Sequence, residues 1–283
     1  MVPGDPDSRA RKTAEELKKR GNDCFHKNKV GAAIDLYTEA FTLCPTWCVP
    51  LVNRALCNKK LENWDKVVAD CETVIRMDAT NLKAHFFLGQ AHLSMNRAAD
   101  AVANLNQALK LARKTESSIK EEVWRALARA KYESHSSEAS MRAVRRADLL
   151  RRLKDLLRED VGRRLKGKDA GLPDIIDNTE ALEADNSLLD EIFRSDELRY
   201  QGDDIPNWCT CQLTLDCFYE PVCTPSGISY EQNALLEHLS KVGEFDPVTR
   251  DPLRKKDLRK NIGLRNAVEC YLNDNPWAFY HAM

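Results

Sequence analysis

Small, medium-sized and large apolar residues in the first 115 residues recur with a period of 34 residues. A period of about 20–50 residues indicates stacked units, because each unit alone leaves an apolar face uncovered. Four columns in phase argue strongly against coincidence, and they predict an array of at least three units. The columns are Gly21, Ala55 and Gly89; Ala33, Val67 and Ala101; Ala40, Val74 and Ala108; and Tyr37, Cys71 and Leu105.

The period and its columns resemble the tetratricopeptide repeat, in which two antiparallel helices form one unit. The resemblance implies an all-helical superhelix of three repeats over residues 13–115, after an N-terminal tail at residues 1–12. Small column residues would let the helices approach closely, and the column that begins with Tyr37 would wedge between neighbouring units. The last unit needs a cap, and Ser118-Ile-Lys-Glu121 is typical of a capping box that opens a seventh helix.

Charge changes abruptly after this helix. Residues 142–168 carry eleven basic and four acidic residues, whereas residues 169–204 carry twelve acidic and two basic ones. Both segments also have apolar residues at helical spacing, which predicts an antiparallel helical hairpin with a leucine-rich seam. The alternative is that the arginine-rich segment binds RNA or acidic lipid. The expected seam consists of Leu150, Leu153, Leu157, Val161 and Leu165 in the first segment and Leu182, Leu188, Leu189, Ile192 and Phe193 in the second.

The net charge of −1 gives no overall bias toward nucleic acid or anionic membranes, and neither is an expected partner. No run approaches the roughly 18 consecutive apolar residues of a membrane span, and residues 1–10 lack the apolar core of a secretory signal. Ten irregularly spaced cysteines favour reduced thiols over a disulfide framework. We therefore expect a cytoplasmic protein, with the nucleus as a second compartment.

Two loop motifs in the last 79 residues carry the candidate chemistry. Residues 220–231 (EPVCTPSGISYE) and residues 245–253 (FDPVTRDPL) flank an expected helix at residues 231–240. The motifs and their spacing resemble the U-box, a small α+β, RING-like module without zinc, here over residues 205–279. A zinc site is the competing interpretation, but the nearby cysteines begin with a C-x-C pair and no second pair follows His238. We expect no metal and no cofactor.

Polar residues in the array resemble the carboxylate clamp of chaperone-receptor tetratricopeptide domains. The clamp residues by resemblance are Lys18, Asn22, Asn53 and Lys83. Two ammonium groups and two amides can satisfy both carboxylates of a C-terminal Asp, here in the sequence Glu-Glu-Val-Asp. A further acidic contact falls at Glu121 or Glu122. By the same resemblance, an apolar pocket for the preceding side chains is walled by Val49, Leu56, Phe86, Ile119 and Val123.

The U-box resemblance implies that this module binds a ubiquitin-conjugating enzyme charged with ubiquitin. Arg250 maps to the residue that holds the thioester in a reactive pose, which is catalysis by orientation. No cysteine has an evident activating neighbour, so we expect no covalent ubiquitin intermediate. Asn261 maps to a structural residue that braces the loops. The implied contact residues for the conjugating enzyme are Leu213, Leu215, Cys223, His238, Pro247 and Arg250.

Together these features resemble the chaperone-associated ubiquitin ligases that join a tetratricopeptide receptor to a U-box. The resemblance implies an E3 ubiquitin-protein ligase that binds heat-shock chaperones of the 70 and 90 kDa classes and promotes ubiquitination of misfolded clients for degradation. Residues 116–204 would then be a capping helix and a hairpin that contributes to a homodimer. Two alternatives remain open at this point: a non-enzymatic co-chaperone scaffold, and an RNA-associated scaffold.

Overall fold

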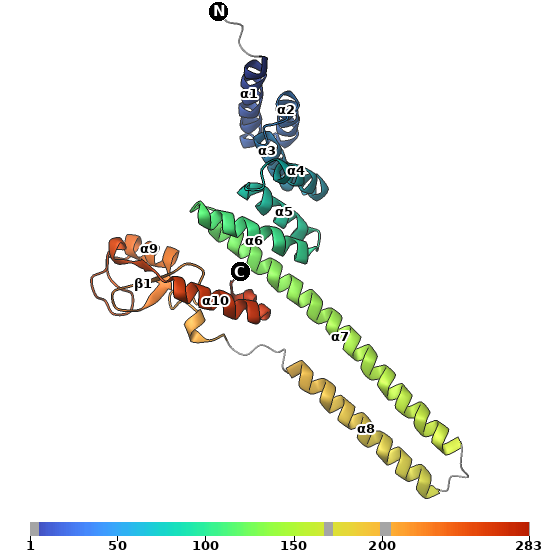
Figure 1. Ribbon diagram of the computed structural model, residues 1–283. Coiled ribbons are helices and arrows are strands. Elements are labelled where there is room, and N and C mark those ends of the chain that lie inside the picture. Colours follow the sequence, from blue (N-terminus) through green and yellow to red (C-terminus); the bar gives the residue numbers. More distant parts are fainter. Residues whose placement is uncertain (1–5, 167–171, 199–204, 283) are drawn as a thin grey trace, which may run out of the picture.

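The computed structural model describes residues 6–166, 172–198 and 205–282, and Figure 1 shows their arrangement. The N-terminal part is helical, and a small sheet lies in the C-terminal part. Among the described residues, no helix is long and apolar enough to cross a membrane. The first six helices are α1 (Pro6–His26), α2 (Val30–Leu43), α3 (Val49–Lys60), α4 (Trp64–Met77), α5 (Leu82–Ser94) and α6 (Ala98–Lys114).

Each of these helices packs against the next, which forms the array of helix pairs expected from the sequence. The small column residues lie where two helices come closest: a Cβ atom on Gly21 would lie 2.6 Å from the Tyr37 ring, and one on Gly89 would lie 2.5 Å from Leu105 Cγ. Only glycine permits this approach. Helix α1 already begins at Pro6, inside the segment predicted to be a tail.

The turn inside each unit also repeats. Asn28, Glu62 and Asn96 all have a positive φ, at 59°, 57° and 57°. These residues end the first helix of each pair in a left-handed conformation, which Asn adopts more readily than Glu. A local backbone device therefore recurs with the same period as the packing columns.

Helices α7 (Lys120–Lys166) and α8 (Leu172–Leu198) form an antiparallel hairpin that projects away from the array (Figure 1). Lys154 Nζ lies 2.7 Å from Asp190 Oδ1 across the hairpin, as expected for a basic helix beside an acidic one. Helix α7 begins at Lys120, two residues after the predicted cap residue Ser118. The predicted seam is only partly correct, because Leu188 and Ile192 are 55% and 51% exposed.

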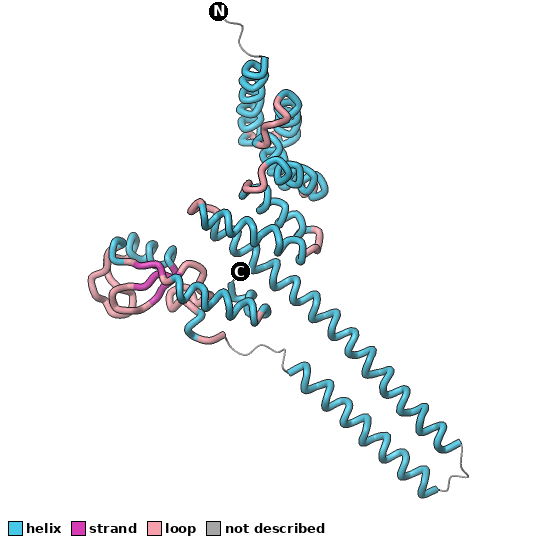
Figure 2. Tube along the Cα trace, viewed as in Figure 1, coloured by secondary structure: helices cyan, strands magenta, loops and turns pink. Residues whose placement is uncertain are grey.

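The C-terminal module (residues 205–282) contains a three-stranded antiparallel sheet. Its strands β1 (Pro221–Cys223), β2 (Ser229–Glu231) and β3 (Arg259–Lys260) have the spatial order β2-β1-β3. Val222 in the central strand pairs with Tyr230 on one side and Lys260 on the other. Figure 2 shows the strands beside α9 and surrounded by long loops. In chain order the elements are the 3₁₀ helix η1 (Asn207–Cys209), β1 (Pro221–Cys223), β2 (Ser229–Glu231), α9 (Gln232–Lys241), η2 (Lys255–Asp257), β3 (Arg259–Lys260), α10 (Ile262–Asp274) and η3 (Pro276–Ala282).

Candidate functional site

Polar side chains of the predicted clamp come from the first helix of each unit. Lys18 and Asn22 lie one turn apart on α1, Asn53 lies on α3, and Lys83 lies in the first turn of α5. The amide of Asn53 donates to Asn22 Oδ1 at 3.2 Å, so the structure joins the two amides directly. Lys83 is exposed and Lys18 is partly exposed, which leaves both ammonium groups accessible to an anion.

Tyr37 orients this amide pair. Its hydroxyl donates to Asn22 Oδ1 at 2.8 Å, which leaves the Asn22 NH₂ group free to face a ligand. Burial raises the pKa of Tyr37 to about 12, so the hydroxyl stays protonated and remains a donor. The sequence pattern marked Tyr37 only as a packing residue, and its second role depends on the close approach of α2 to Gly21.

The residues expected to wall an apolar peptide pocket fall into two groups. Val49 is 39% exposed, and Leu56 and Ile119 are partly exposed. Phe86 and Val123, in contrast, are 2% and 0% exposed and belong to the core. Both side chains are therefore shielded from solvent in this structure, and their contact with a peptide stays a prediction.

Lys59 explains part of this burial, and the sequence did not mark it. Its ammonium lies 5.7 Å from the centre of the Phe86 ring and covers that side chain. Burial lowers the pKa of Lys59, while nearby Glu122 acts in the opposite direction. Lys59 and Glu122 both line a hollow of about 400 Å³, which Gln90 and Arg125 also line.

The two candidate acidic residues on α7 face different neighbours. Glu121 accepts from Arg125 at 2.9 Å and from Asn233 of the C-terminal module at 2.6 Å. Glu122 is exposed and lines the hollow beside Lys59. Of the pair left open by the sequence, Glu122 is the carboxylate available on the array side.

The loop that precedes β1, at residues 210–220, exposes two leucines of the C-terminal module. Leu213 and Leu215 are 37% and 77% exposed. Leu215 has a φ of 63° and closes a turn through its backbone N–H, which donates to Cys211 O at 2.8 Å. A leucine held in the left-handed region costs free energy, so the surrounding turn must hold it there. The result is an exposed apolar side chain in a fixed position.

The remaining predicted contact residues lie on other parts of the same module: Cys223 on β1, His238 on α9, and Pro247 and Arg250 in the second loop motif. His238 Nε2 lies 3.1 Å from Phe245 O, and the two rings make an edge contact. The Arg250 guanidinium lies 4.9 Å from the centre of the Phe245 ring, and Arg250 itself is exposed with a φ of 66°. Pro247 and Cys223 are both partly exposed, and the Cys223 thiol donates to Thr224 O at 3.4 Å.

One buried carboxylate ties the two loops together. Asp246, which is 2% exposed, accepts from Tyr230 Oη at 2.8 Å and from Ser226 Oγ at 2.9 Å. It also accepts the backbone N–H groups of Val248 and Thr249 at 2.9 and 3.2 Å. These hydrogen bonds outweigh burial and lower the pKa of Asp246 to about 2. One hydrogen-bonded carboxylate thus links the two loop motifs.

A second carboxylate and an amide brace the sheet. Glu231 accepts the backbone N–H groups of Tyr219 and Glu220 at 2.9 and 3.1 Å, although burial raises its pKa. Asn261 donates to Ser229 Oγ at 3.1 Å and accepts from Leu264 N at 3.0 Å, so it joins β2 to the start of α10.

The cysteines of this module are buried in the packing around these loops. Cys209, Cys211 and Cys217 are at most 5% exposed, and burial raises the pKa values of Cys209 and Cys217 to about 11 and about 12. A thiol with a raised pKa is a poor nucleophile near neutral pH. Within the described residues, no group of three or more His, Cys, Asp or Glu side chains is arranged to hold a metal ion.

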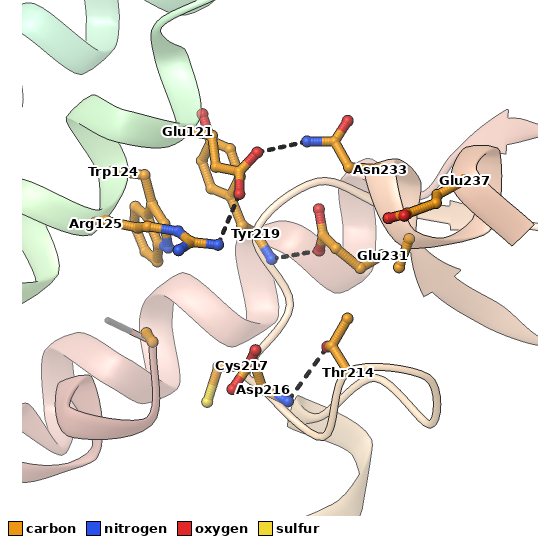
Figure 3. A pocket seen from close by; sticks show the side chains of 12 residues that line it. Glu121, Trp124, Arg125, Thr214, Asp216, Cys217, Tyr219, Glu231, Asn233 and Glu237 are labelled. Carbon is orange, nitrogen blue, oxygen red and sulfur yellow. Dashed lines mark hydrogen bonds and ion pairs between the residues drawn. The ribbon is translucent and has the colours of Figure 1, made fainter.

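A cleft of about 220 Å³ lies where α7 meets the C-terminal module, and its lining side chains are drawn in Figure 3. Glu121 and Trp124 line it from α7, and Tyr219, Glu231 and Asn233 line it from the module. The hydrogen bond from Asn233 to Glu121 spans this cleft. The array and the C-terminal module are therefore in direct contact.

Known proteins resemble this chain over nearly its whole length. A family model described as "U-box domain" matches residues 205–277. "E3 ubiquitin-protein ligase CHIP" of Arabidopsis thaliana is 36% identical over 272 residues, which is 94% of this chain and 95% of that protein. "DnaJ homolog subfamily C member 7" of Homo sapiens is 30% identical over 105 residues, 37% of this chain and 21% of that protein. Among solved structures, "First TPR of Spaghetti (RPAP3) bound to HSP90 peptide SRMEEVD" is 25% identical, with 42% of this chain and 95% of that chain covered and a TM-score of 0.37.

Proposed function

The chain belongs to the CHIP family of U-box E3 ubiquitin-protein ligases, and we propose that it ubiquitinates proteins held by heat-shock chaperones. Its array binds the C-terminal Glu-Glu-Val-Asp tail of chaperones of the 70 and 90 kDa classes. Its U-box recruits a charged ubiquitin-conjugating enzyme and promotes transfer to misfolded clients, which are then degraded. The similarity over 94% of the chain carries this proposal, because it includes both the array and the U-box. It also favours a ligase over a non-enzymatic scaffold.

The tail site proposed for the array uses charge and amide geometry. Lys18 and Lys83 each supply a cation for the carboxylates of the terminal Asp, and the amides of Asn22 and Asn53 donate beside them. The link between Asn22 and Asn53 supports this proposal, because it holds two donors ready before the tail arrives. Glu122 then faces the residues that precede the terminal Asp.

The conjugating enzyme docks on apolar residues that include the exposed Leu213 and Leu215 and the partly exposed Pro247. Arg250 acts after docking, by holding the ubiquitin thioester in a reactive pose. A substrate lysine then attacks the thioester carbonyl, and the thiolate stays on the conjugating enzyme. The raised pKa values of Cys209 and Cys217 support a route without ubiquitin on the ligase itself.

The hairpin, alone or together with the U-box, supplies the surface for a homodimer. Several apolar residues on both of its helices are exposed to solvent in the described part of the chain, and a second copy would bury them. They include Met141, Val144, Leu149, Leu156, Ile176 and Leu188. Light scattering at micromolar concentration tests this proposal, and a monomer contradicts it.

Ten free cysteines support a reducing compartment, the cytoplasm with the nucleus as a second site.

Peptide binding by the full chain tests the array's role. We expect Lys83→Ala to weaken binding of a Glu-Glu-Val-Asp peptide by about 2–5 kcal/mol, because one carboxylate loses its partner after leaving water. Amidating the peptide's C-terminus should weaken binding comparably. Lys66→Ala, which removes an exposed lysine on α4, is the matched control and should leave the Kd unchanged. Wild-type affinity for Lys83→Ala and for the amidated peptide would refute the clamp.

A further inference from the structure

The array and the U-box meet at a contact that no proposed binding residue makes. The Trp124 ring of α7 stacks on Tyr219 with the ring centres 5.2 Å apart, and it also packs against Phe279 of η3 at 6.2 Å. The three side chains are 4%, 6% and 1% exposed. Side chains as buried as these are packed as in the core of a domain, whereas most contacts between mobile domains are less buried and more polar.

Beside this aromatic stack, three cations from both domains surround one buried carboxylate. The Glu220 side chain is 7% exposed and lies 3.7 Å from Arg113 Nε and 3.8 Å from Lys120 Nζ, both on the array side. Arg265 of the U-box lies 3.6 Å from the same carboxylate. Arg113 also pairs with Glu269 of α10. We call the aromatic stack and this ion cluster together the joint.

Further contacts line the rim of the joint. Glu116 lies between Lys120 and Lys260 at 3.1 and 2.8 Å, so one carboxylate bridges the array and the U-box. Hydrogen bonds from these two lysines lower the pKa of Glu116 to about 2. Lys131 of α7 donates to Asn273 of α10 at 2.6 Å. The two domains are therefore linked along the first three turns of α7.

The closed joint leaves both proposed binding sites open. Leu215 is 77% exposed and Arg250 is exposed on the U-box, while Lys83 is exposed on the array. Helix α7 contributes to both places: Glu122 lines the hollow beside Lys59, and Trp124 packs in the joint. These two residues are two positions apart on the same helix. Both sites can consequently be occupied without opening the joint.

We infer that the joint fixes the direction and reach of the U-box relative to a bound chaperone tail, so that Trp124 and Glu220 are positioning residues that select which client lysines receive ubiquitin. The inference rests on the proposed function. In the transfer, a lysine amine forms an isopeptide bond as the thioester C–S bond breaks, the thiolate leaves and the amine's proton passes to water. A lysine within the fixed reach has a high effective concentration at the thioester, and one outside it does not.

A tail-bearing substrate with lysines at several positions tests this inference. The substrate is an extended polypeptide that ends in Glu-Glu-Val-Asp, with lysines spaced along its length, and mass spectrometry measures the ubiquitin on each. We expect the full-length wild-type protein to modify one narrow segment. The double variant Trp124→Ala/Glu220→Gln should spread the modification and reduce the share of the dominant lysine about twofold or more, because a looser joint lowers its effective concentration. The Kd for the tail peptide and discharge to free lysine should not change.

Two controls separate positioning from damage to the fold. Trp124→Phe keeps an aromatic ring in the joint and should retain the wild-type lysine pattern, and Glu39→Gln removes an exposed charge on α2 and should do the same. Hydrogen exchange of the full chain reports whether the joint has opened around Tyr219. Should the Trp124 variant fold poorly, Glu220→Gln/Glu269→Gln removes only the ion cluster and is expected to spread the pattern as well.

Several results would overturn the inference. An unchanged lysine pattern in a variant whose joint has lost exchange protection means that the joint does not select lysines. Unchanged protection in both double variants means that these residues do not hold the domains together. Failure of the wild-type protein to bind the tail peptide, or to discharge ubiquitin to free lysine, refutes the proposed function itself and the inference with it.

Discussion

The repeat array and the U-box are stabilised by different kinds of contact. In the array, the same contact recurs between neighbouring helices, as when Gly21 meets Tyr37 and Gly89 meets Leu105. In the U-box, single polar groups join segments that are separated in sequence, as when Asp246 joins Tyr230 and Ser226. Damage to one array contact should therefore stay local, whereas loss of one cross-link in the U-box should affect the whole module.

The largest effect on stability is expected at Asp246. Asp246→Ala should destabilise the U-box by about 2–4 kcal/mol, because it removes four hydrogen bonds and leaves the buried Tyr230 hydroxyl without its acceptor. Urea unfolding of the full chain, followed by hydrogen exchange in residues 205–282, measures the loss. Asp251→Ala removes an exposed carboxylate from the same loop and serves as control. Equal stability of the two variants would contradict the cross-link.

The same carboxylate should make U-box stability depend on pH. Its pKa is about 2 in the folded protein and 3.8 in an ordinary Asp, so its contribution is present above about pH 4 and is lost as the pH falls toward 2. The contribution amounts to about 2 kcal/mol. Unfolding titrations of the wild type and Asp246→Asn should converge across this window. Parallel curves would show that Asp246 does not titrate as described.

A smaller, local loss is expected in the array. Gly89→Ala should destabilise the third unit by about 1–3 kcal/mol, because its Cβ would overlap Leu105 and α5 and α6 would have to move apart. Gly31→Ala is the matched control, since no atom lies within 4 Å of its Cβ and alanine favours helices. Hydrogen exchange should show faster opening of α5 and α6 with little change in residues 205–282. Equal exchange throughout the chain would remove the contrast between the two regions.

No effect is expected from metal removal. The loops of the U-box are held by Asp246 and the sheet by Glu231, so a strong chelator should leave the thermal unfolding of the full chain unchanged. Stoichiometric zinc in the purified protein, lost together with its folded structure, would contradict this expectation.

The sequence predicted the repeated part of the fold because its causes are local and periodic. The columns through Gly21 and Gly89 reappear as close helix contacts. The positive-φ turns at Asn28, Glu62 and Asn96 have the same period, but their residue types differ and the pattern of apolar positions does not include them. No local sequence pattern indicates the joint, because Trp124 and Tyr219 lie far apart in the sequence, on either side of the hairpin, and are in contact only in the folded protein.

Part of the candidate site was also predicted, because its residues follow the same repeat. Residue types located Asn22 and Asn53 on successive first helices, where they do meet. Phe86 and Val123 are buried because both of their helices pack on more than one side, and sequence spacing alone does not tell which side faces a ligand. The role of Asp246 depends on Tyr230 from another strand, a pairing that only the folded module creates.

The contrast extends to the proposed function, in which the array would select the target and the U-box would accelerate transfer. Leu213→Ala should abolish binding of the conjugating enzyme and ligase activity together. Arg250→Ala should leave binding measurable, because Arg250 acts mainly in the reactive complex. Neither change should alter the Kd for the tail peptide, because the two sites are in separate domains.

Single-turnover discharge of ubiquitin from the conjugating enzyme to free lysine, measured beside a binding titration, tests the ligase mechanism most directly. We predict that Arg250→Ala slows discharge about 10- to 100-fold while the conjugating enzyme still binds. Discharge at the wild-type rate from a bound Arg250→Ala complex would contradict the account, and the U-box would then serve as a docking platform alone.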